Sequence, residues 1–342
     1  MRASVPNRID LAGGTTDIYP LYLFMDGGCT VNVGITIESA VEFRGWEKQA
    51  IRIASRDLGE TVEAPDPDRL PTDGPLGLIG RTVRALPPGK GMEILAHNQA
   101  PAGSGLGASS ALLVALTAGL LKLRLESVEP EKVVDLAAAI ECACIQVPTG
   151  KQDHIAAYFG GVSCLEFGCR GFSREELCGD TDDRRRLEEM MILSYTGEGR
   201  FSGMNNWDVT KGFIDNDAEI REKLLKIRDV ARDLARALRL RDWDEIPRLV
   251  DREWDIRRRL APGISTPRID RIAGAASAAG ASANKVCGAG GGGCMLTLTS
   301  GRKRSAVERA VLEAGGTILP FSITSEGLTW SNASARPTQA RN

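Results

Sequence analysis

Residues 102–111 read AGSGLGASSA, and an apolar run at 112–121 follows directly. Three alternating glycines let backbone N–H groups approach an anion, because no Cβ stands in the way. The pair Ser109 and Ser110 is expected to cap the helix that the apolar run forms, at the end where free amides and the helix dipole favour phosphate. The stretch therefore predicts a phosphate cradle that opens a helix, since a turn needed only for packing requires fewer glycines and no serine pair.

Two common nucleotide motifs resemble this stretch, but their spacing differs. A P-loop requires a Lys directly after its last glycine, and Ala108 occupies that position. A dinucleotide fingerprint requires GxGxxG and an acidic residue about twenty positions later. The spacing here is GxGxG, although Glu126 lies at a suitable distance. A nicotinamide-dependent dehydrogenase is therefore kept only as a remote alternative.

Length and charge limit the class of protein. The chain has 342 residues, 42% of them hydrophobic, and a formal net charge of −2. This length predicts two domains, because domains commonly hold roughly 100–200 residues. The small net charge gives no sign of a nucleic-acid partner. The basic runs at 184–186 and 257–259 are flanked by acidic residues, so both are expected on solvated helix faces.

No segment has the pattern of a membrane anchor. The most apolar stretch, residues 111–121, is shorter than the about 20 residues that span a bilayer. Arg2, Arg8 and Asp10 interrupt any apolar core at the N-terminus, so a signal peptide is not expected. We expect a soluble, cytoplasmic protein without a membrane partner.

The cysteines and histidines restrict the chemistry. Eight cysteines are scattered without a CxxC pair, and the chain has only two histidines. A Cys/His zinc site is therefore disfavoured, and free thiols are expected. A histidine-dependent nucleophile would have to use His97 or His154. Carboxylates, hydroxyls and a bound cation are the expected reacting groups.

Hydrophobic periodicity predicts a strand-rich first third, with helices beyond it. Strands or hairpins are expected at residues 28–43 and 51–54, and further strands at 285–287 and 295–299 flank the loop GAGGGG at 288–293. Helices are expected at residues 111–123, 131–147, 217–240, 243–260 and 266–279. The polar residues 331–342 are expected to fray.

A second candidate site is PNRIDLAGGTTD, residues 6–17. A short strand at 9–12 runs into Gly13 and Gly14, and Arg8 and Asp17 flank the turn. By itself this pattern is more typical of a strand, a turn and a surface ion pair. The functional interpretation places Arg8 near anionic groups and Asp17 on substrate hydroxyls.

A third candidate site is TGKQDHIAAYF, residues 149–159. Thr149 and Gln152 have the spacing of a capping box, which predicts a helix with Asp153 in its first turn. A carboxylate there is held anionic, as a base requires, although a surface aspartate favoured by the helix dipole has the same pattern. On the preceding helix, Glu141 lies beside apolar positions, where it is costly unless paired, and Mg²⁺ is a candidate partner. A solvent-facing Glu141 is the alternative.

In this order and at these separations, PNRIDLAGGTTD, PAGSGLGASSA and CGAGGGG resemble the three signature motifs of the GHMP kinases. That superfamily includes galactokinase, homoserine kinase, mevalonate kinase and phosphomevalonate kinase, and the resemblance spans nearly the whole chain. It implies an α+β, two-domain fold with ATP and substrate in the cleft between the domains. Residues 1–180 would form an N-terminal ATP-binding domain with a left-handed βαβ crossover, and residues 181–342 a ferredoxin-like C-terminal domain.

The resemblance also implies a role for each candidate residue. Asp153 matches the catalytic aspartate and Arg8 the basic residue beside it, while Ser110 and Glu141 would hold Mg²⁺. The residues that would wrap the ATP phosphates are Pro101, Gly103, Ser104, Gly105, Leu106, Gly107, Ala108, Ser109 and Ser110. The residues that would face the substrate are Asp17, Gly13, Gly14, Gly290 and Gly291.

The substrate is the least determined part. Residues 150–161, GKQDHIAAYFGG, are most similar to the kinases of D-glycero-D-manno-heptose 7-phosphate, which phosphorylate the anomeric hydroxyl of a sugar phosphate. Galactokinases carry Glu-His where this chain has Gly14 and Thr15, which argues against galactose. The alternatives are a fucose- or galactose-type kinase, a mevalonate or homoserine kinase, and a catalytically silent binding protein of this fold. Arg200 and Lys211 are candidates for receiving a phosphate already on the substrate, and a monomer or homodimer is expected.

Overall fold

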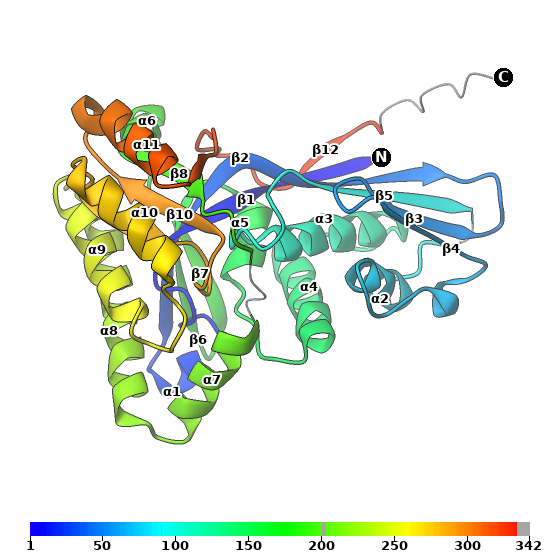
Figure 1. Ribbon diagram of the computed structural model, residues 1–342. Helices are drawn as coiled ribbons and strands as arrows, with labels where there is room; N and C mark the ends of the chain where they lie inside the picture. Colours follow the sequence, from blue (N-terminus) through cyan, green and yellow to red (C-terminus); the bar gives the residue numbers. More distant parts are fainter. Residues whose placement is uncertain (90, 200–202, 334–342) are drawn as a thin grey trace.

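Two β-sheets form the framework of the protein (Figure 1). The structure is a computed structural model that describes residues 1–89, 91–199 and 203–333. The first sheet consists of β1 (Arg2–Ala12), β2 (Gly28–Gly45), β3 (Ile51–Ser55), β4 (Glu60–Ala64), β5 (Met92–Asn98), β6 (Val162–Gly168), β7 (Gly171–Glu176) and β12 (Thr329–Ser331). Its strand order is β12-β1-β2-β5-β3-β4, with β6 paired to β2 and β7 paired to β6.

Strand β2 connects the two halves of this sheet. Where the sequence predicted a strand or hairpin, the structure has one strand of 18 residues. One edge of β2 pairs with β6 near its start and with β5 near its end, and β1 pairs along the other edge. This pairing places Arg8 opposite Gly34 and Asp10 opposite Asn32, both on a strand that is longer than predicted.

The second sheet consists of β8 (Met191–Tyr195), β9 (Ala283–Val286), β10 (Cys294–Leu298) and β11 (Thr317–Ile318). Its order is β11-β8-β10-β9, and every neighbouring pair is antiparallel. In chain order this is fourth, first, third, second, which is the split βαβ arrangement of ferredoxin-like domains. The expected ferredoxin-like fold is therefore confirmed for this part of the chain.

Helices cover both sheets. The described α-helices are α1 (Leu21–Phe24), α2 (Gly77–Ala85), α3 (Ala108–Leu123), α4 (Pro130–Ile145), α5 (Gln152–Phe159), α6 (Thr181–Met190), α7 (Gly203–Ile214), α8 (Ala218–Arg239), α9 (Glu245–Arg257), α10 (Pro267–Ala278) and α11 (Arg304–Glu313), with short 3-10 helices η1 (Pro67–Arg69) and η2 (Gly301–Lys303). The six predicted helices correspond to α3, α4, α5, α8, α9 and α10, and Asp153 lies in the first turn of α5 as predicted. Among the described residues, no helix is long and apolar enough to cross a bilayer.

One hydrophobic core joins the two sheets. Helices α8 and α9 lie along one side of the molecule, beside both sheets (Figure 1). Val230 and Leu234 of α8 and Leu249 of α9 are buried in the same cluster as Val31 of β2 and Leu296 of β10. Because the apolar faces of these helices contact both sheets, they fix the relative position of the motifs that each sheet carries.

The end of the described chain returns to the first sheet. Strand β12 pairs with β1, and Ser331 lies opposite Arg2. Ser331 was expected to fray but belongs to a strand, because β1 supplies hydrogen-bond partners; residues 334–342 lie outside the described residues. The predicted domain boundary after residue 180 falls between β7 and α6, and the position of this boundary stays a prediction.

Candidate active site

The glycine cradle has the predicted backbone. Gly103, Gly105 and Gly107 have φ of 68°, 74° and 73°, in the left-handed region that favours glycine. Helix α3 begins at Ala108, so its free amides face the cradle as expected. The serine pair does not cap this helix: Gly107 is the N-cap, and Ser109 and Ser110 are the second and third helical residues. The left-handed Gly107 therefore caps the helix in place of the predicted serines, which lie two and three residues later.

The glycine loop at residues 288–293 packs directly on the cradle. The amide of Cys294 donates to the Ser104 carbonyl at 2.7 Å. A Cβ on Gly105 would lie 2.4 Å from the Cys287 carbonyl oxygen, so only glycine permits this approach. Gly290 and Gly291 instead lie against Ile264, whose carbonyl accepts the Gly291 amide at 2.7 Å. The loop therefore joins the cradle on one side and the segment before α10 on the other.

Arg8 joins the first segment to the cradle and to Asp153. Its Nη1 donates to the Gly105 carbonyl at 2.7 Å, and its Nη2 lies 2.6 Å from Asp153 Oδ1. Asp153 is the second residue of α5, and a Cβ on Gly107 would lie 3.0 Å from its carboxylate. Burial lowers the pKa of Arg8, but the charges of Asp153 and Asp10 outweigh burial and raise it. The structure thus brings a charged pair to the N-terminus of α3, although these residues are 145 positions apart.

Only one member of this pair is accessible. The Arg8 side chain is 3% exposed, whereas the Asp153 side chain is 22% exposed. Arg8 is therefore fixed by buried contacts, while part of the Asp153 side chain stays accessible. A substrate hydroxyl can approach a carboxylate placed in this way, as a general base requires.

Glu141 is buried and paired, rather than facing solvent. Ser110 Oγ donates to both of its carboxylate oxygens, at 3.1 and 2.9 Å, and His154 Nε2 lies 3.2 Å away. Burial raises the pKa of Glu141, but contact with His154 and Ser110 outweighs burial and lowers it. A hydroxyl and an ionised carboxylate supply the oxygen ligands that Mg²⁺ prefers, so these residues fit the ion. The sequence did not reveal the position of His154, because a lone buried histidine has no periodic signal.

Asp17 takes the place of the predicted capping box. Helix α5 starts at Gln152, and Lys151 precedes it without a side-chain cap, so the Thr149 and Gln152 pairing is wrong. The Gln152 amide donates instead to Asp17 Oδ2 at 2.8 Å. Asp17 is 1% exposed, and burial, together with the charges of Asp153 and Asp10, raises its pKa to about 6. A carboxylate from the first segment therefore holds the helix that carries Asp153.

Four further charged residues lie behind the turn at residues 13–17. The sequence analysis identified none of them as part of a site. Asp10, Glu253 and Lys285 are 0% exposed and Arg257 is 2% exposed. The expectation that the run 257–259 lies on a solvated face is wrong for Arg257, whose guanidinium pairs with Glu253 at 2.6 Å. It holds for Arg258 and Arg259, which are exposed and pair with Asp255. Burial alone would lower the pKa of Arg257, but Glu253 and Asp10 raise it.

Arg200 and Lys211 were the candidates for binding a phosphate group already present on the substrate. Lys211 lies on α7, is largely exposed and forms an ion pair with Asp215 one helical turn away. Arg200 lies outside the described residues. The structure therefore adds no support for Lys211 as an anion ligand.

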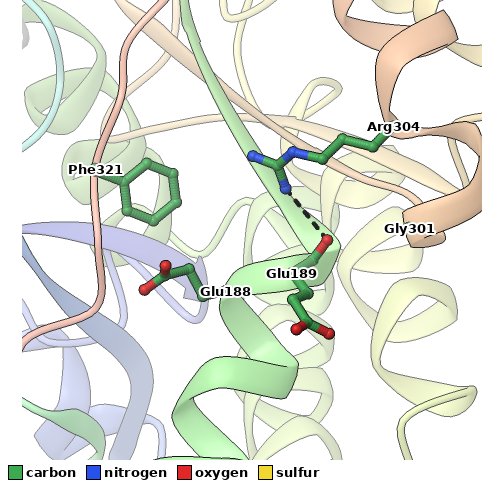
Figure 2. A pocket seen from close by; sticks show the side chains of 5 residues that line it. All are labelled: Glu188, Glu189, Gly301, Arg304 and Phe321. Carbon is green, nitrogen blue, oxygen red and sulfur yellow. Dashed lines mark hydrogen bonds between the residues drawn. The ribbon is translucent and has the colours of Figure 1, made fainter.

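Two cavities lie away from the residues of the candidate site. A cavity of about 270 Å³ is lined by Glu188, Glu189, Gly301, Arg304 and Phe321 (Figure 2). A neighbouring cavity of about 340 Å³ shares Glu189 and Gly301. Neither is lined by a predicted site residue. Both cavities are lined by residues of α6 and η2. In the first cavity Glu188 accepts from Ser322 and Ile323, and Arg304 donates to the carbonyls of Glu189 and Met191.

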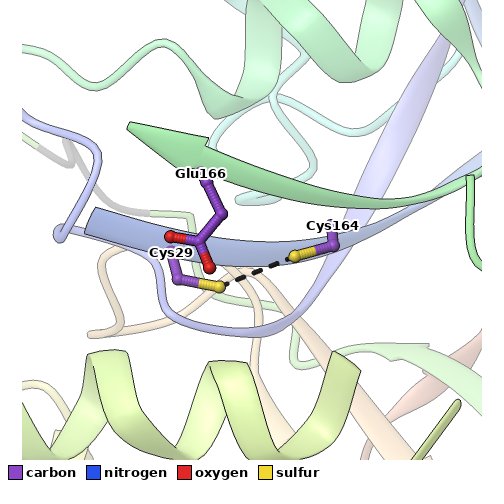
Figure 3. Close-up of side chains that lie close together, drawn as sticks. All are labelled: Cys29, Cys164 and Glu166. Carbon is purple, nitrogen blue, oxygen red and sulfur yellow. Dashed lines mark hydrogen bonds between the residues drawn. The ribbon is translucent and has the colours of Figure 1, made fainter. Parts of the chain in front are cut away.

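Two buried thiols form a separate cluster. All eight cysteines are free, as expected. Cys29 Sγ and Cys164 Sγ are 3.7 Å apart on paired strands, with Glu166 beside them (Figure 3). The Glu166 carboxylate also pairs with Arg232 of α8 at 3.2 Å, which already compensates its charge. The cluster therefore serves as packing between β2, β6 and α8.

The comparisons with known proteins agree with this geometry. Residues 77–161 match the N-terminal domain of the GHMP kinases, and residues 234–317 match the C-terminal domain. The chain belongs to the GHMP kinases. It is therefore an ATP-dependent kinase with the two-domain fold of this family, and the dehydrogenase alternative is excluded.

Relatives of this GHMP kinase act on different acceptors. The D-glycero-alpha-D-manno-heptose 7-phosphate kinase of Campylobacter jejuni is 26% identical, over 96% of this chain and 98% of its own. The mevalonate kinase of Thermococcus onnurineus is also 26% identical, over 95% of this chain and 97% of its own. The crystal structure of a D-glycero-D-manno-heptose 1-phosphate kinase from Bacteroides thetaiotaomicron has a TM-score of 0.79 at 25% identity, and the match covers 97% of this chain and 99% of that one.

Proposed function

We propose that this kinase transfers the γ-phosphoryl group of ATP to the anomeric hydroxyl of D-glycero-D-manno-heptose 7-phosphate. The observation that carries the proposal is the partly accessible Asp153 carboxylate, held by Arg8 at the N-terminus of α3. Similarity to heptose-phosphate kinases over nearly the full chain supports a sugar phosphate as acceptor.

The cradle is the proposed site for the ATP phosphates. Free amides at the start of α3 and the left-handed glycines form a surface that suits phosphate oxygens. Mg²⁺, when bound, neutralises charge on the phosphates during transfer. Ser110 and Glu141 are the proposed ligands, and their mutual hydrogen bonds hold both oxygen groups together before any ion arrives.

Asp153 is the proposed base and Arg8 the proposed stabiliser of charge. Asp153 accepts the proton of the anomeric hydroxyl, and the hydroxyl oxygen attacks the γ-phosphorus while the bond from that phosphorus to the bridging oxygen breaks and ADP leaves. An anomeric hydroxyl is more acidic than an ordinary alcohol, so a carboxylate is an adequate base. Arg8 lies between Asp153 and the Gly105 carbonyl, where its positive charge stabilises the negative charge near the transferring group.

Asp17 and the nearby backbone are the proposed acceptor site. Asp17 is fixed by Gln152, the residue before Asp153, so a sugar bound by Asp17 is close to the base. Gly13 and Gly14 form the turn that leads to Asp17, and Gly290 and Gly291 belong to the loop at residues 288–293. We assign these residues to hydroxyls of the sugar other than the reacting one.

A panel of acceptors tests this proposal. ADP release is measured with heptose 7-phosphate, fucose, galactose, mevalonate and homoserine at equal concentration. We expect the highest kcat/KM with heptose 7-phosphate, and a phosphorus resonance coupled to the anomeric proton in the product. Faster turnover of mevalonate would replace the sugar assignment, and no turnover with any of the five would contradict the proposed acceptor class.

A further inference from the structure

The buried charge network behind the turn at residues 13–17 takes no part in the proposed phosphoryl transfer. It contains Asp10 of β1, Glu253 and Arg257 of α9, and Lys285 of β9. Paired buried charges seldom add stability over an apolar core of similar volume. The groups that these charges hold in place therefore indicate their role.

Arg257 holds the backbone of the turn at residues 13–17. Its Nη2 donates to the Gly14 carbonyl at 2.7 Å, and its Nη1 lies 3.4 Å from Thr15 Oγ1. Glu253 Oε1 accepts from Arg257 Nε at 2.8 Å and from Nη2 at 2.6 Å, which fixes the guanidinium. The same oxygen accepts the Gly13 amide at 3.4 Å. One ion pair thus contacts three successive residues of the turn.

The turn needs such support, because its backbone is unusual. Thr15 has φ of 80°, a region that β-branched residues rarely adopt. Such conformations persist where surrounding contacts determine them, and they cluster at functional sites. Two residues later the chain reaches Asp17, so the shape of the turn sets where this carboxylate lies.

Lys285 supports the other side of the same turn. Its Nζ donates to the carbonyl and carboxylate of Asp10 at 3.1 and 3.0 Å, and it lies 3.5 Å from Glu253 Oε2. A Cβ on Gly14 would lie 2.6 Å from Asp10 Oδ2, so this carboxylate packs against the turn. The network therefore encloses residues 13–15 from α9 and from β9.

We propose that Arg257, fixed by Glu253, is a positioning residue for the acceptor: it holds the turn at 13–17 in the shape that presents Asp17 to the substrate. This inference rests on the proposed function, because it takes the turn as the acceptor site. Arg257 contacts Gly14 and Thr15, whereas the cradle is contacted by Arg8 and Cys294. Loss of Arg257 should therefore affect acceptor binding and spare ATP binding.

Kinetics of Arg257→Lys test this separation. Lysine keeps the charge but replaces the rigid planar fork of the guanidinium by a single nitrogen on a flexible chain, so it cannot hold the turn and Glu253 in the same geometry. We expect the KM for the acceptor to rise roughly tenfold, as for the loss of a charged hydrogen bond, and the KM for ATP to change less than about twofold. Arg258→Lys is the matched control, because Arg258 is exposed on the same helix. An unchanged acceptor KM, or an equal rise for both substrates, would overturn the inference.

A double variant separates positioning from stability. Glu253→Leu with Arg257→Met replaces the ion pair by apolar side chains of similar volume, a change that is often neutral for stability. We expect a melting temperature near that of the wild type, with the acceptor KM still raised. A normal acceptor KM in this folded variant would show that the pair is only structural.

Amide hydrogen exchange gives a readout that does not depend on the acceptor. In Arg257→Lys we expect faster exchange in a peptide spanning residues 9–20 and unchanged exchange in one spanning 101–112. If the wild type uses another acceptor, the proposed function fails, and the KM comparison is made with that acceptor instead. If no acceptor is turned over, exchange alone decides, and unchanged exchange at residues 9–20 refutes the positioning role.

Discussion

Replacing Asp17 by Asn should stabilise the protein at neutral pH while it weakens acceptor binding. Asp17 is 1% exposed, and burial, with the charges of Asp153 and Asp10, raises its pKa to about 6. A carboxyl that ionises less readily in the folded chain than in the unfolded chain opposes folding whenever it is charged. Asparagine has the same shape, and its side-chain oxygen can accept the Gln152 amide hydrogen.

The magnitude follows from the two pKa values. The shift from 3.8 to about 6 is about two units, and each unit corresponds to about 1.36 kcal/mol. The neutral carboxyl therefore contributes about 3 kcal/mol, fully present below pH 3.8 and lost as the pH rises through 6. The Asn variant keeps this contribution at every pH. We expect it to be more stable than the wild type by about 3 kcal/mol at pH 7 and by almost nothing near pH 4.

The assay is thermal unfolding of both proteins between pH 4 and 7.5. For a chain of this size, 1 kcal/mol shifts the melting temperature by roughly 2 °C, so the expected gain at pH 7 is about 6 °C. Titration calorimetry with the acceptor should show weaker binding by the same variant.

A surface exchange serves as the control for this experiment. Asp68 is exposed on η1, and Asp68→Asn should leave the melting temperature unchanged at both ends of the pH range. Two results would refute the reasoning: equal melting temperatures of Asp17→Asn and wild type at pH 7, or a gain that persists unchanged at pH 4.

Three further predictions concern the cradle and its carboxylates. Asp153→Asn should lower kcat by about 10²- to 10⁴-fold and leave the ATP affinity from calorimetry nearly intact; undiminished turnover would remove Asp153 as the base. Glu141→Gln should raise the Mg²⁺ concentration for half-saturation roughly tenfold or more, and weaken Mn²⁺ binding measured by electron paramagnetic resonance; unchanged Mn²⁺ affinity would contradict its role as a ligand. Gly107→Ala should destabilise the protein by about 1–2 kcal/mol in urea unfolding and reduce kcat, because φ is 73° and the new Cβ would lie 3.0 Å from Asp153. Gly168→Ala, which has open space around its Cβ position, is the control, and equal effects of the two changes would refute this explanation.

The sequence predicted best those features that depend on nearby residues. Only glycine readily adopts the left-handed conformation of Gly103, Gly105 and Gly107, so the pattern itself determines the cradle. The start of α8 was also predictable, because Asp217 accepts the amides of Glu219 and Ile220 within the same turn.

Predictions of helix caps from the nearby sequence failed where another residue made the hydrogen bond or started the helix. Thr149 and Gln152 have the spacing of a capping box, but Asp17 accepts the Gln152 amide from 135 residues away. The serines after Gly107 resemble a cap, but the left-handed glycine already starts α3. In each case the local pattern was real, and the tertiary contact decided which group made the hydrogen bond.

Charge pairing was the least predictable feature. The run Arg257, Arg258, Arg259 reads as one basic patch, yet Arg257 is 2% exposed while its neighbours are exposed. The 100° rotation per residue of a helix turns one of three adjacent side chains toward the core. Which one turns inward depends on how α9 packs, and the sequence of α9 alone does not specify this.

By itself, the sequence determined the backbone of the glycine cradle and the order of the three glycine-rich segments, and it indicated Arg8, Glu141 and Asp153 as candidates. These follow from residue type and short spacing, because backbone conformation and helix periodicity are local properties. The tertiary structure decided which charges meet: Arg8 pairs with Asp153 across 145 residues, and Arg257 reaches Gly14 across 243. These residues lie close together only because the two sheets and α9 pack around one core. Their separation in the sequence gives no indication of this contact.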